Sequence, residues 1–223
     1  MKRATIIVAG GSGQRMGGAL PKQFMAVGGK PVLLRTIETF YTFDPQMILV
    51  VVLPATQIDV WNELLMHHQS SIPHVVAEGG ATRFESVKNG INALPEDVEL
   101  IGVHDGVRPF VSMDTLARCY SNAKPAIVPV IPMYDSLRQL TEMGNNSVDR
   151  SSYVAVQTPQ VFSASLLRQA YSQPYNVLYT DDASVVEALG ECIELTEGNR
   201  ENIKLTTPFD LIIAEGIISG MPL

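Results

Sequence analysis

Hydrophobic residues along this chain gather in short runs that alternate with longer amphipathic stretches. The apolar runs predict β-strands at residues 4–9, 47–53, 74–77, 100–104 and 126–131. Between them, apolar residues three and four positions apart predict helices at residues 32–40, 57–69, 83–91 and 112–122. The run at 47–53 is apolar on both faces, which is typical of a central strand in a parallel sheet.

The alternation is interrupted at residues 132–157. Segments 134–141 and 148–157 have the pattern of strands, and Met143-Gly144-Asn145-Asn146 between them favours a hairpin turn. Neither strand has a long apolar face, and an isolated hairpin is only marginally stable in water. The pattern therefore predicts a protruding β-hairpin arm that packs against another subunit, with a flap over its own domain as the alternative.

After the arm, the helical pattern returns. It predicts a helix at 163–171, a helix capped by Thr180, a strand at 192–195, and a last helix that Thr207 and Pro208 begin and that ends near residue 219. The whole order predicts one α/β domain, residues 1–223, with a doubly wound, mostly parallel sheet. Ligands of such sheets bind at the carboxyl ends of the strands.

Composition and charge exclude some classes of binding partner. The formal net charge is −7 and the chain has no basic run, which argues against nucleic-acid binding. No segment approaches the roughly 18 apolar residues that cross a membrane. Cys119 and Cys192 lack a metal-ligand spacing, so we interpret both as core thiols of a cytoplasmic protein.

The first predicted strand leads into a glycine-rich turn. Gly10-Gly11-Ser12-Gly13 can close backbone amides around an anion, and the cations Arg15 and Lys22 follow. No Gly-Lys-Ser/Thr completes a Walker A loop, and Met16 stands at the third glycine of a Rossmann fingerprint. The turn therefore predicts a polyphosphate site of another type, rather than a turn that merely needs glycine.

A second glycine pair precedes the helix at 83–91. Gly79-Gly80-Ala81 allows a ligand ring to approach the backbone, and its amides could contact a nucleobase edge. Arg83 and Ser86 lie three residues apart on one helical face. A simple helix cap is the alternative interpretation.

Further polar residues follow another predicted strand. Asp105 and Gly106 come at its carboxyl end, where a carboxylate suits a metal, a ribose hydroxyl or a substrate hydroxyl, and Arg108 is close by. We interpret His104 as a buried core histidine rather than a general base. No Ser/His/Asp arrangement and no His/Cys metal cluster is evident, which favours transfer at phosphorus by positioning and cationic charge.

Taken together, the motifs resemble the family of 2-C-methyl-D-erythritol 4-phosphate cytidylyltransferases. They span nearly the whole chain: Ala9-Gly10-Gly11-Ser12-Gly13-Gln14-Arg15-Met16, Pro21-Lys22-Gln23-Phe24, Gly79-Gly80-x-x-Arg83-x-x-Ser86-Val87, His104-Asp105-Gly106-Val107-Arg108-Pro109, Val148-Asp149-Arg150, Gln157-Thr158-Pro159-Gln160, Thr180-Asp181-Asp182-Ala183-Ser184 and Asn202-Ile203-Lys204. The resemblance implies a nucleotidyltransferase fold of Rossmann-like type and a homodimer joined through the arms. It also implies that CTP and the polyol phosphate react to give the CDP-alcohol and pyrophosphate, with Mg²⁺ held mainly by the CTP phosphates.

The resemblance also implies roles for individual residues. Those expected to bind CTP are Gly10, Gly11, Ser12, Gly13, Arg15, Lys22, Gly80, Ala81 and Ser86, with Arg83 supporting the cytidine loop. Those expected at the acceptor are Asp105, Gly106, Arg108, Lys204, the partner's Ser136 and the partner's Arg150. Catalysis would rest on the cations Arg15, Lys22, Arg150 and Lys204.

Two alternatives remain open from the sequence. The beginning Ala9-Gly10-Gly11 also occurs in the related ribitol-5-phosphate cytidylyltransferases, while Asp135-Ser136-Leu137-Arg138 favours the methylerythritol family despite serine in place of its usual threonine. A non-catalytic nucleotide-binding subunit is a hypothesis of another class. The presence of Arg15, Lys22, Asp105 and Lys204 together argues against it.

Overall fold

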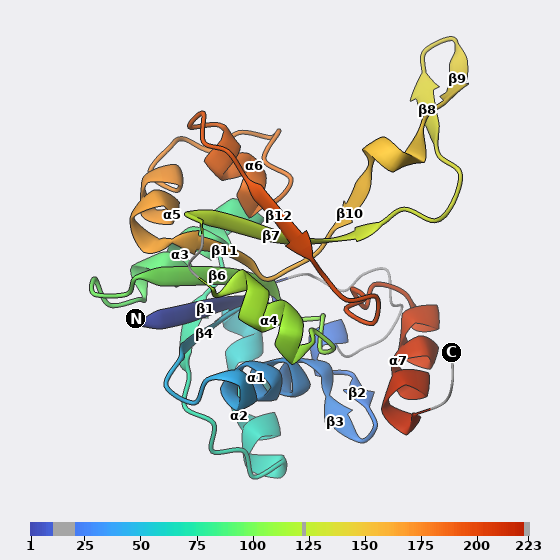
Figure 1. Ribbon diagram of the computed structural model, residues 1–223. Coiled ribbons are helices and arrows are strands. Elements are labelled where there is room, and N and C mark those ends of the chain that lie inside the picture. The colour runs from blue at the N-terminus through green and yellow to red at the C-terminus, as the bar shows by residue number, and fades with distance from the viewer. Residues whose placement is uncertain (11–20, 122–123, 221–223) are drawn as a thin grey trace.

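A computed structural model describes residues 1–10, 21–121 and 124–220 of the chain (Figure 1). In this described part, eight strands form a central sheet in the order β10-β7-β11-β6-β1-β4-β5, with β12 beside β7. These strands are β1 (Arg3–Val8), β4 (Ile48–Leu53), β5 (Val75–Glu78), β6 (Leu100–Asp105), β7 (Ala126–Pro132), β10 (Val154–Val156), β11 (Gln160–Ser163) and β12 (Glu194–Glu197). Two small pairs stand apart: β2 (Ala26–Val27) with β3 (Lys30–Pro31), and β8 (Arg138–Thr141) with β9 (Gly144–Ser147).

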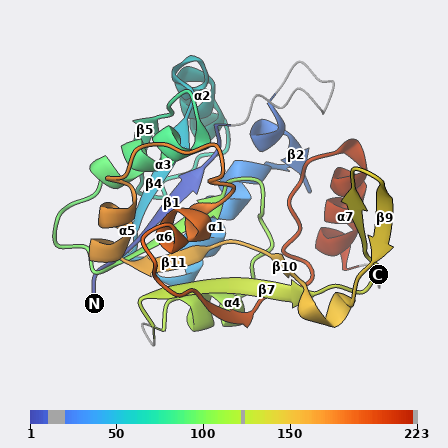
Figure 2. The same cartoon turned by 90° about the horizontal axis from the view of Figure 1, so that it is seen from above.

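Helices cover both faces of the sheet (Figures 1 and 2). One face carries α3 (Arg83–Asn92), α5 (Ala164–Ala170) and α6 (Asp182–Glu187), and the other carries α1 (Val32–Phe43), α2 (Ile58–His67) and α4 (Met113–Cys119). Short 3₁₀ turns are η2 (Lys22–Phe24), η3 (Ala55–Gln57) and η4 (Arg150–Ser152). The last helix, α7 (Pro208–Ser219), packs in a third cluster through Ala214, together with Val27 of β2.

The alternation of side chains along a strand explains why both faces need cover. In β1, Ala4 and Ile6 enter the cluster beneath α3, whereas Ile7 enters the cluster beneath α1. All three are fully buried. The doubly wound α/β architecture predicted from the apolar runs is thereby confirmed.

Strand β11 was not predicted, and together with β10 it makes the sheet mixed. It pairs antiparallel with both β6 and β7, while β1 pairs parallel with β4 and β6. Its four residues carry only two apolar side chains, Val161 and Phe162, which is too short a run to show a period. Both are buried, so the strand is held by packing rather than by its own pattern.

The arm is shorter than predicted. Residues 148–157 do not form one strand: Asp149 caps η4, and only β10 continues, pairing antiparallel with β7 in the central sheet. The hairpin proper is β8–β9, in which Thr141 pairs with Gly144, so the turn is Glu142-Met143 and not 143–146. Every residue of β8 and β9 is exposed, and the hairpin stands away from the body (Figure 1).

Four smaller predictions are corrected. Asp181, not Thr180, caps α6, because its side chain accepts from the Ser184 amide. Helix α4 ends at Cys119 rather than at residue 122, and β12 begins at Glu194 rather than at 192. Cys119 is buried as predicted, but Cys192 is exposed in the segment just before β12, where its neighbour Ile193 packs against the core instead.

Candidate active site

A cleft of about 310 Å³ opens at the carboxyl ends of β1 and β6. It brings together eight of the residues singled out from the sequence: Gly10, Lys22, Gly80, Ala81, Arg83, Ser86, Asp105 and Lys204. These come from segments nearly 200 positions apart in the chain, and the parallel pairing of β1 with β6 brings the strand ends at Gly10 and Asp105 together. Gly11, Ser12, Gly13 and Arg15 lie outside the described residues.

The end of β1 is fixed by main-chain bonds to its neighbours. The Ala9 amide donates to Val52 O of β4 (2.9 Å), and the Gly106 amide donates to Val8 O (2.9 Å). Gln23 adds a side-chain bond, from Nε2 to Ala9 O at 2.8 Å. Since Gln23 follows Lys22 directly and is buried, it holds η2, and with it the lysine, against the strand end. The sequence motif included Gln23 but did not assign this role.

The loop at residues 79–82 is closed tightly against the start of α3. The Ser86 hydroxyl accepts from the Gly80 amide (3.1 Å) and donates to Thr82 O (2.9 Å). A Cβ on Gly80 would lie 2.3 Å from Cβ of Glu85, so glycine is required there. Thr82 and Glu85 form a capping box. The start of α3 is thus capped, and the capped loop also lines the cleft, so contact of this loop with a nucleobase stays a prediction.

Asp105 is the centre of charge in the cleft. Its Oδ2 lies 3.1 Å from Lys204 Nζ and accepts from Arg108 Nε at 3.0 Å. Burial opposes ionisation of this carboxyl, but Lys204, Arg83 and Arg108 outweigh burial and hold its pKa well below the ordinary value. Asp105 is therefore an anion that orients two cations, and it is not a proton donor.

His104 is a buried core histidine, as the sequence interpretation held. Nε2 lies 2.9 Å from Arg108 O, which only accepts, so Nε2 carries the proton. Nδ1 then accepts from the Thr158 hydroxyl at 3.1 Å, and that oxygen accepts from the Asp105 amide. Burial lowers the pKa of His104 to about 4. The neutral ring fixes the turn that carries Asp105 and Arg108.

The remaining predicted site residues lie in other places. Gly106 is buried, and a Cβ there would lie 3.0 Å from Ala9 Cβ, so this glycine permits the close approach of two strand ends. Ser136 and Arg150 are exposed on the arm, where Arg150 donates to Tyr134 O, and neither lines the cleft of its own chain.

The described residues contain no cluster of three or more His, Cys, Asp or Glu side chains that could hold a metal. In the cleft, Asp105 is the one carboxylate among the described lining residues, and it is bound to two cations. Within residues 1–10, 21–121 and 124–220, no helix has the length and apolarity to cross a bilayer.

Comparison with known proteins shows which family the chain belongs to. Residues 4–220 match the family described as IspD, 2-C-methyl-D-erythritol 4-phosphate cytidylyltransferase. The chain belongs to this family. The cytidylyltransferase of Phocaeicola vulgatus is 56% identical over 220 residues, which cover 98% of this chain and 100% of that protein. The cytidylyltransferase of Bacteroides fragilis is 54% identical with the same coverage.

A solved structure supports the same fold. The 4-diphosphocytidyl-2C-methyl-D-erythritol synthase of Anaerococcus prevotii superimposes with a TM-score of 0.84 at 26% identity, covering 98% of this chain and 96% of that one. The family resemblance found in the sequence motifs is therefore confirmed. The predicted enzyme class, a nucleotidyltransferase, is confirmed with it.

Proposed function

We propose that the chain is a cytoplasmic cytidylyltransferase that joins CTP and 2-C-methyl-D-erythritol 4-phosphate, giving 4-diphosphocytidyl-2-C-methyl-D-erythritol and pyrophosphate for isoprenoid precursor synthesis. The family match over residues 4–220 carries the choice of substrates. It also favours this acceptor over ribitol 5-phosphate, since the close relatives carry the methylerythritol name. The free thiols of Cys119 and Cys192 suit a reducing compartment.

The geometry fits a direct transfer at phosphorus. An oxygen of the acceptor's phosphate attacks the α-phosphorus of CTP, a P–O bond forms, and the bond to the pyrophosphate leaving group breaks in line. The attacking oxygen is already an anion, so the step needs no general base. This agrees with a neutral, buried His104 and with a Ser86 hydroxyl engaged in its own loop.

Cationic side chains do the main work in this proposal. Both reactants are anions, so charge neutralisation in a partly dehydrated cleft lowers the barrier most. Lys22 would hold the triphosphate at the end of β1, together with Gly10 and the predicted cation Arg15. Lys204, which lines the cleft and pairs with Asp105, would hold the acceptor. Arg108 is the second cation on Asp105 and would assist, although it is not among the residues that line the cleft.

Mg²⁺ fits this cleft as a companion of CTP rather than as a protein-held ion. The donor set is cations, backbone amides and one engaged carboxylate, so the phosphates and water would supply its oxygen ligands. When bound, the ion would reduce the charge on the triphosphate.

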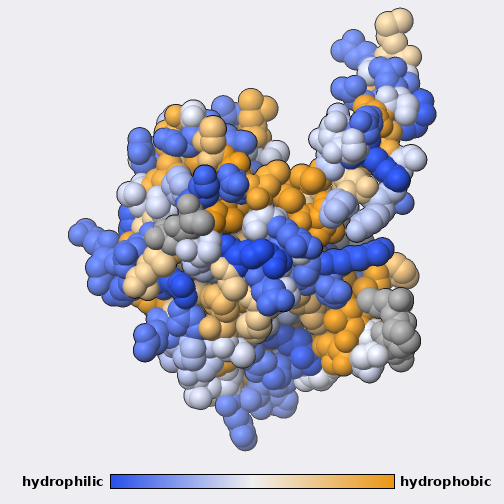
Figure 3. All heavy atoms as spheres, viewed as in Figure 1, coloured by the Kyte–Doolittle hydropathy of each residue, from blue (hydrophilic) through white to orange (hydrophobic). Residues whose placement is uncertain are grey.

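We propose further that two copies associate through the arm, so that the partner's Ser136 and the partner's Arg150 complete the acceptor site. Support comes from exposed apolar side chains on the arm: Leu140 is 84% exposed and Met143 is 100% exposed. Figure 3 shows further hydrophobic surface over α7 and at the base of the arm, where Phe209 and Val154 are exposed. Such surface on a small chain is typical of an interface.

The test is pyrophosphate release with CTP and Mg²⁺, with each acceptor offered separately. Release with methylerythritol phosphate alone is expected. A preference for ribitol 5-phosphate would transfer the chain to the related activity, and CTP binding without release on either acceptor would mean a non-catalytic subunit. Lys22→Ala should lose most turnover while the fold persists, and turnover near that of the unaltered enzyme would reject the role of Lys22.

A further inference from the structure

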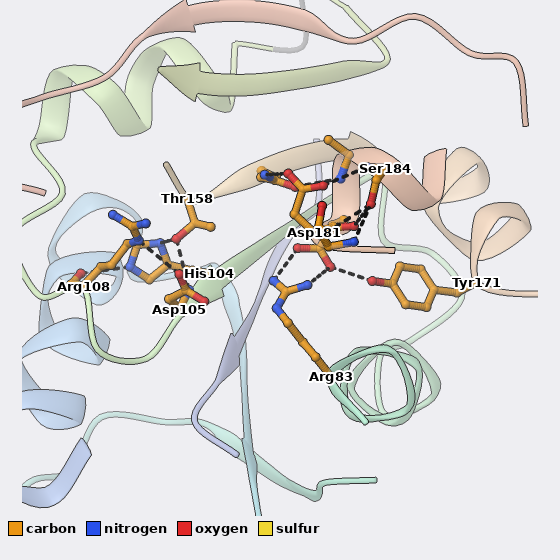
Figure 4. A network of polar contacts seen from close by, with 12 residues as sticks. Arg83, His104, Asp105, Arg108, Thr158, Tyr171, Asp181 and Ser184 are labelled. Atoms are coloured by element: carbon orange, nitrogen blue, oxygen red, sulfur yellow. Dashed lines mark hydrogen bonds and ion pairs between the residues drawn. The ribbon is translucent and has the colours of Figure 1, made fainter. Parts of the chain in front are cut away.

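Arg83 is a cation of the cleft whose hydrogen-bonding fork is already occupied. Its Nη1 donates to Oδ1 of Asp182 at 3.0 Å, and its Nη2 donates to Oδ2 at 2.6 Å. The Asp182 side chain is completely buried, whereas a third of the Arg83 side chain remains exposed. The pair joins the start of α3 to the start of α6, and Figure 4 shows Arg83 reaching toward the segment of Asp181 and Ser184.

The carboxylate of Asp182 is itself held in place. The Tyr171 hydroxyl also donates to Oδ1, at 2.6 Å, and Figure 4 shows Tyr171 and Arg83 pointing toward the same place. The first turn of α6 is fastened by Gln160, whose Nε2 donates to Asp181 Oδ2 and whose Oε1 accepts from the Ala183 amide, both at 2.8 Å. Asp182 therefore cannot follow Arg83 if the guanidinium moves.

A guanidinium that lines an anion-binding cleft would ordinarily bind phosphate through its planar fork. Here the competing acceptor is a carboxylate that has already lost its water. Burial disfavours the charged form of Arg83, but the Asp182 carboxylate outweighs burial and raises the arginine's pKa above its ordinary value. The fork is thus committed to the protein before any nucleotide arrives.

We infer that Asp182 is a positioning residue that withholds Arg83 from the polyphosphate of the nucleotide. This inference rests on the proposed function, in which Lys22 holds the triphosphate at the end of β1. In-line transfer requires one register of the phosphates, and a second free fork in the same cleft would offer another. Asp182 removes that alternative and leaves Arg83 as a strut beside the loop at residues 79–82.

The first test is calorimetric binding of inorganic tripolyphosphate to the enzyme without nucleotide. Asp182→Asn keeps an acceptor for Tyr171 but removes the charge, so Arg83 is released and the affinity should rise about tenfold, the gain from one added charge-assisted contact. Tyr171→Phe keeps the carboxylate and should leave the affinity within about twofold. Unchanged or weaker binding by Asp182→Asn would overturn the inference.

If Asp182→Asn does not fold, a double variant still tests whether Arg83 is withheld from phosphate. Arg83→Met with Asp182→Asn replaces a buried ion pair by two neutral side chains, a change that is often tolerated. Its tripolyphosphate affinity should equal that of the unaltered enzyme. A loss of about tenfold would show that Arg83 is a phosphate ligand, and the inference would be wrong.

Turnover separates this role from a merely structural one. Phosphates held in a second register are bound unproductively, so in Asp182→Asn both kcat and KM for CTP should fall by the same factor, with kcat/KM nearly unchanged. The double variant should recover kcat. A fall in kcat/KM without a fall in KM would indicate structural damage only and would reject the inference. Absence of turnover in the unaltered enzyme, with the binding shift intact, would reject the proposed function alone.

Discussion

The buried neutral ring of His104 should make the free energy of unfolding depend on pH. The unfolded chain binds a proton at this histidine near pH 6.5, whereas burial lowers the folded pKa to about 4. Between these two values the unfolded state holds more protons, so stability falls as the pH is lowered. The contribution is fully present above pH 6.5 and is lost progressively down to about pH 4.

The size of the effect follows from the two pKa values. For one ideal site, lowering the pH from 7 to 4.5 reduces the free energy of unfolding by about 2 kcal/mol. His104 is completely buried, so solvent screening does not reduce this figure. Other groups titrate in the same range, and a matched variant is needed to subtract them.

His104→Gln is that variant, because its amide keeps a donor for Arg108 O and an acceptor for Thr158 while it does not titrate. Urea denaturation of both proteins at the two pH values should show a decrease about 2 kcal/mol larger in the unaltered protein. Parallel decreases would mean that the folded protein protonates His104 without cost, and the account of a neutral ring fixing the Asp105 turn would be wrong.

Three further outcomes are expected. Lys204→Met should reduce kcat/KM for pyrophosphate release by about 10²–10³ through loss of one cation at the reacting phosphates, whereas Lys2→Met, which breaks an exposed pair, should change it little. Gly102→Ala would place a Cβ 1.9 Å from the Tyr120 hydroxyl oxygen. The substitution should therefore lower the free energy of unfolding by about 1–3 kcal/mol in urea denaturation. A decrease below about 0.5 kcal/mol would contradict this packing. Replacing the hairpin at 138–147 by a short polar turn should give monomers in analytical ultracentrifugation, and persistence of a dimer would reject the arm as the interface.

The sequence predicted the parts of the fold in which local pattern and final packing agree. The run at β4 is long, β-branched and apolar on both faces, and the structure buries it on both faces. The carboxyl ends of β1 and β6 were expected to gather ligand-binding residues, and Gly10 and Asp105 do line one cleft. In these cases the residues nearby in the sequence are enough to predict whether a side chain is buried and at which strand end it lies.

The features that the sequence did not reveal depend on contacts between distant segments. In the sequence Asp182 was only a member of the Thr180-Asp181-Asp182-Ala183-Ser184 motif, whereas its partner Arg83 lies 99 positions away. Strand β11 has no pattern of its own and exists because β6 and β7 lie on either side of it. The exposure of Cys192 likewise depends on distant packing, because the adjacent Ile193 contacts the core cluster in its place. Such pairings are fixed by topology, which a single sequence does not display.

The two ends of the arm are held together by the central sheet, so the arm can be replaced as a unit. Pro132 of β7 and Val154 of β10 are Cα partners in an antiparallel ladder, so the two ends of the excursion are held side by side by the body itself. Any hairpin whose ends are one strand spacing apart can be spliced between these positions without disturbing the sheet. If the arms join two copies as proposed above, chains that carried arms of opposite charge would favour mixed pairs over like pairs, and the assembly would become a heterodimer.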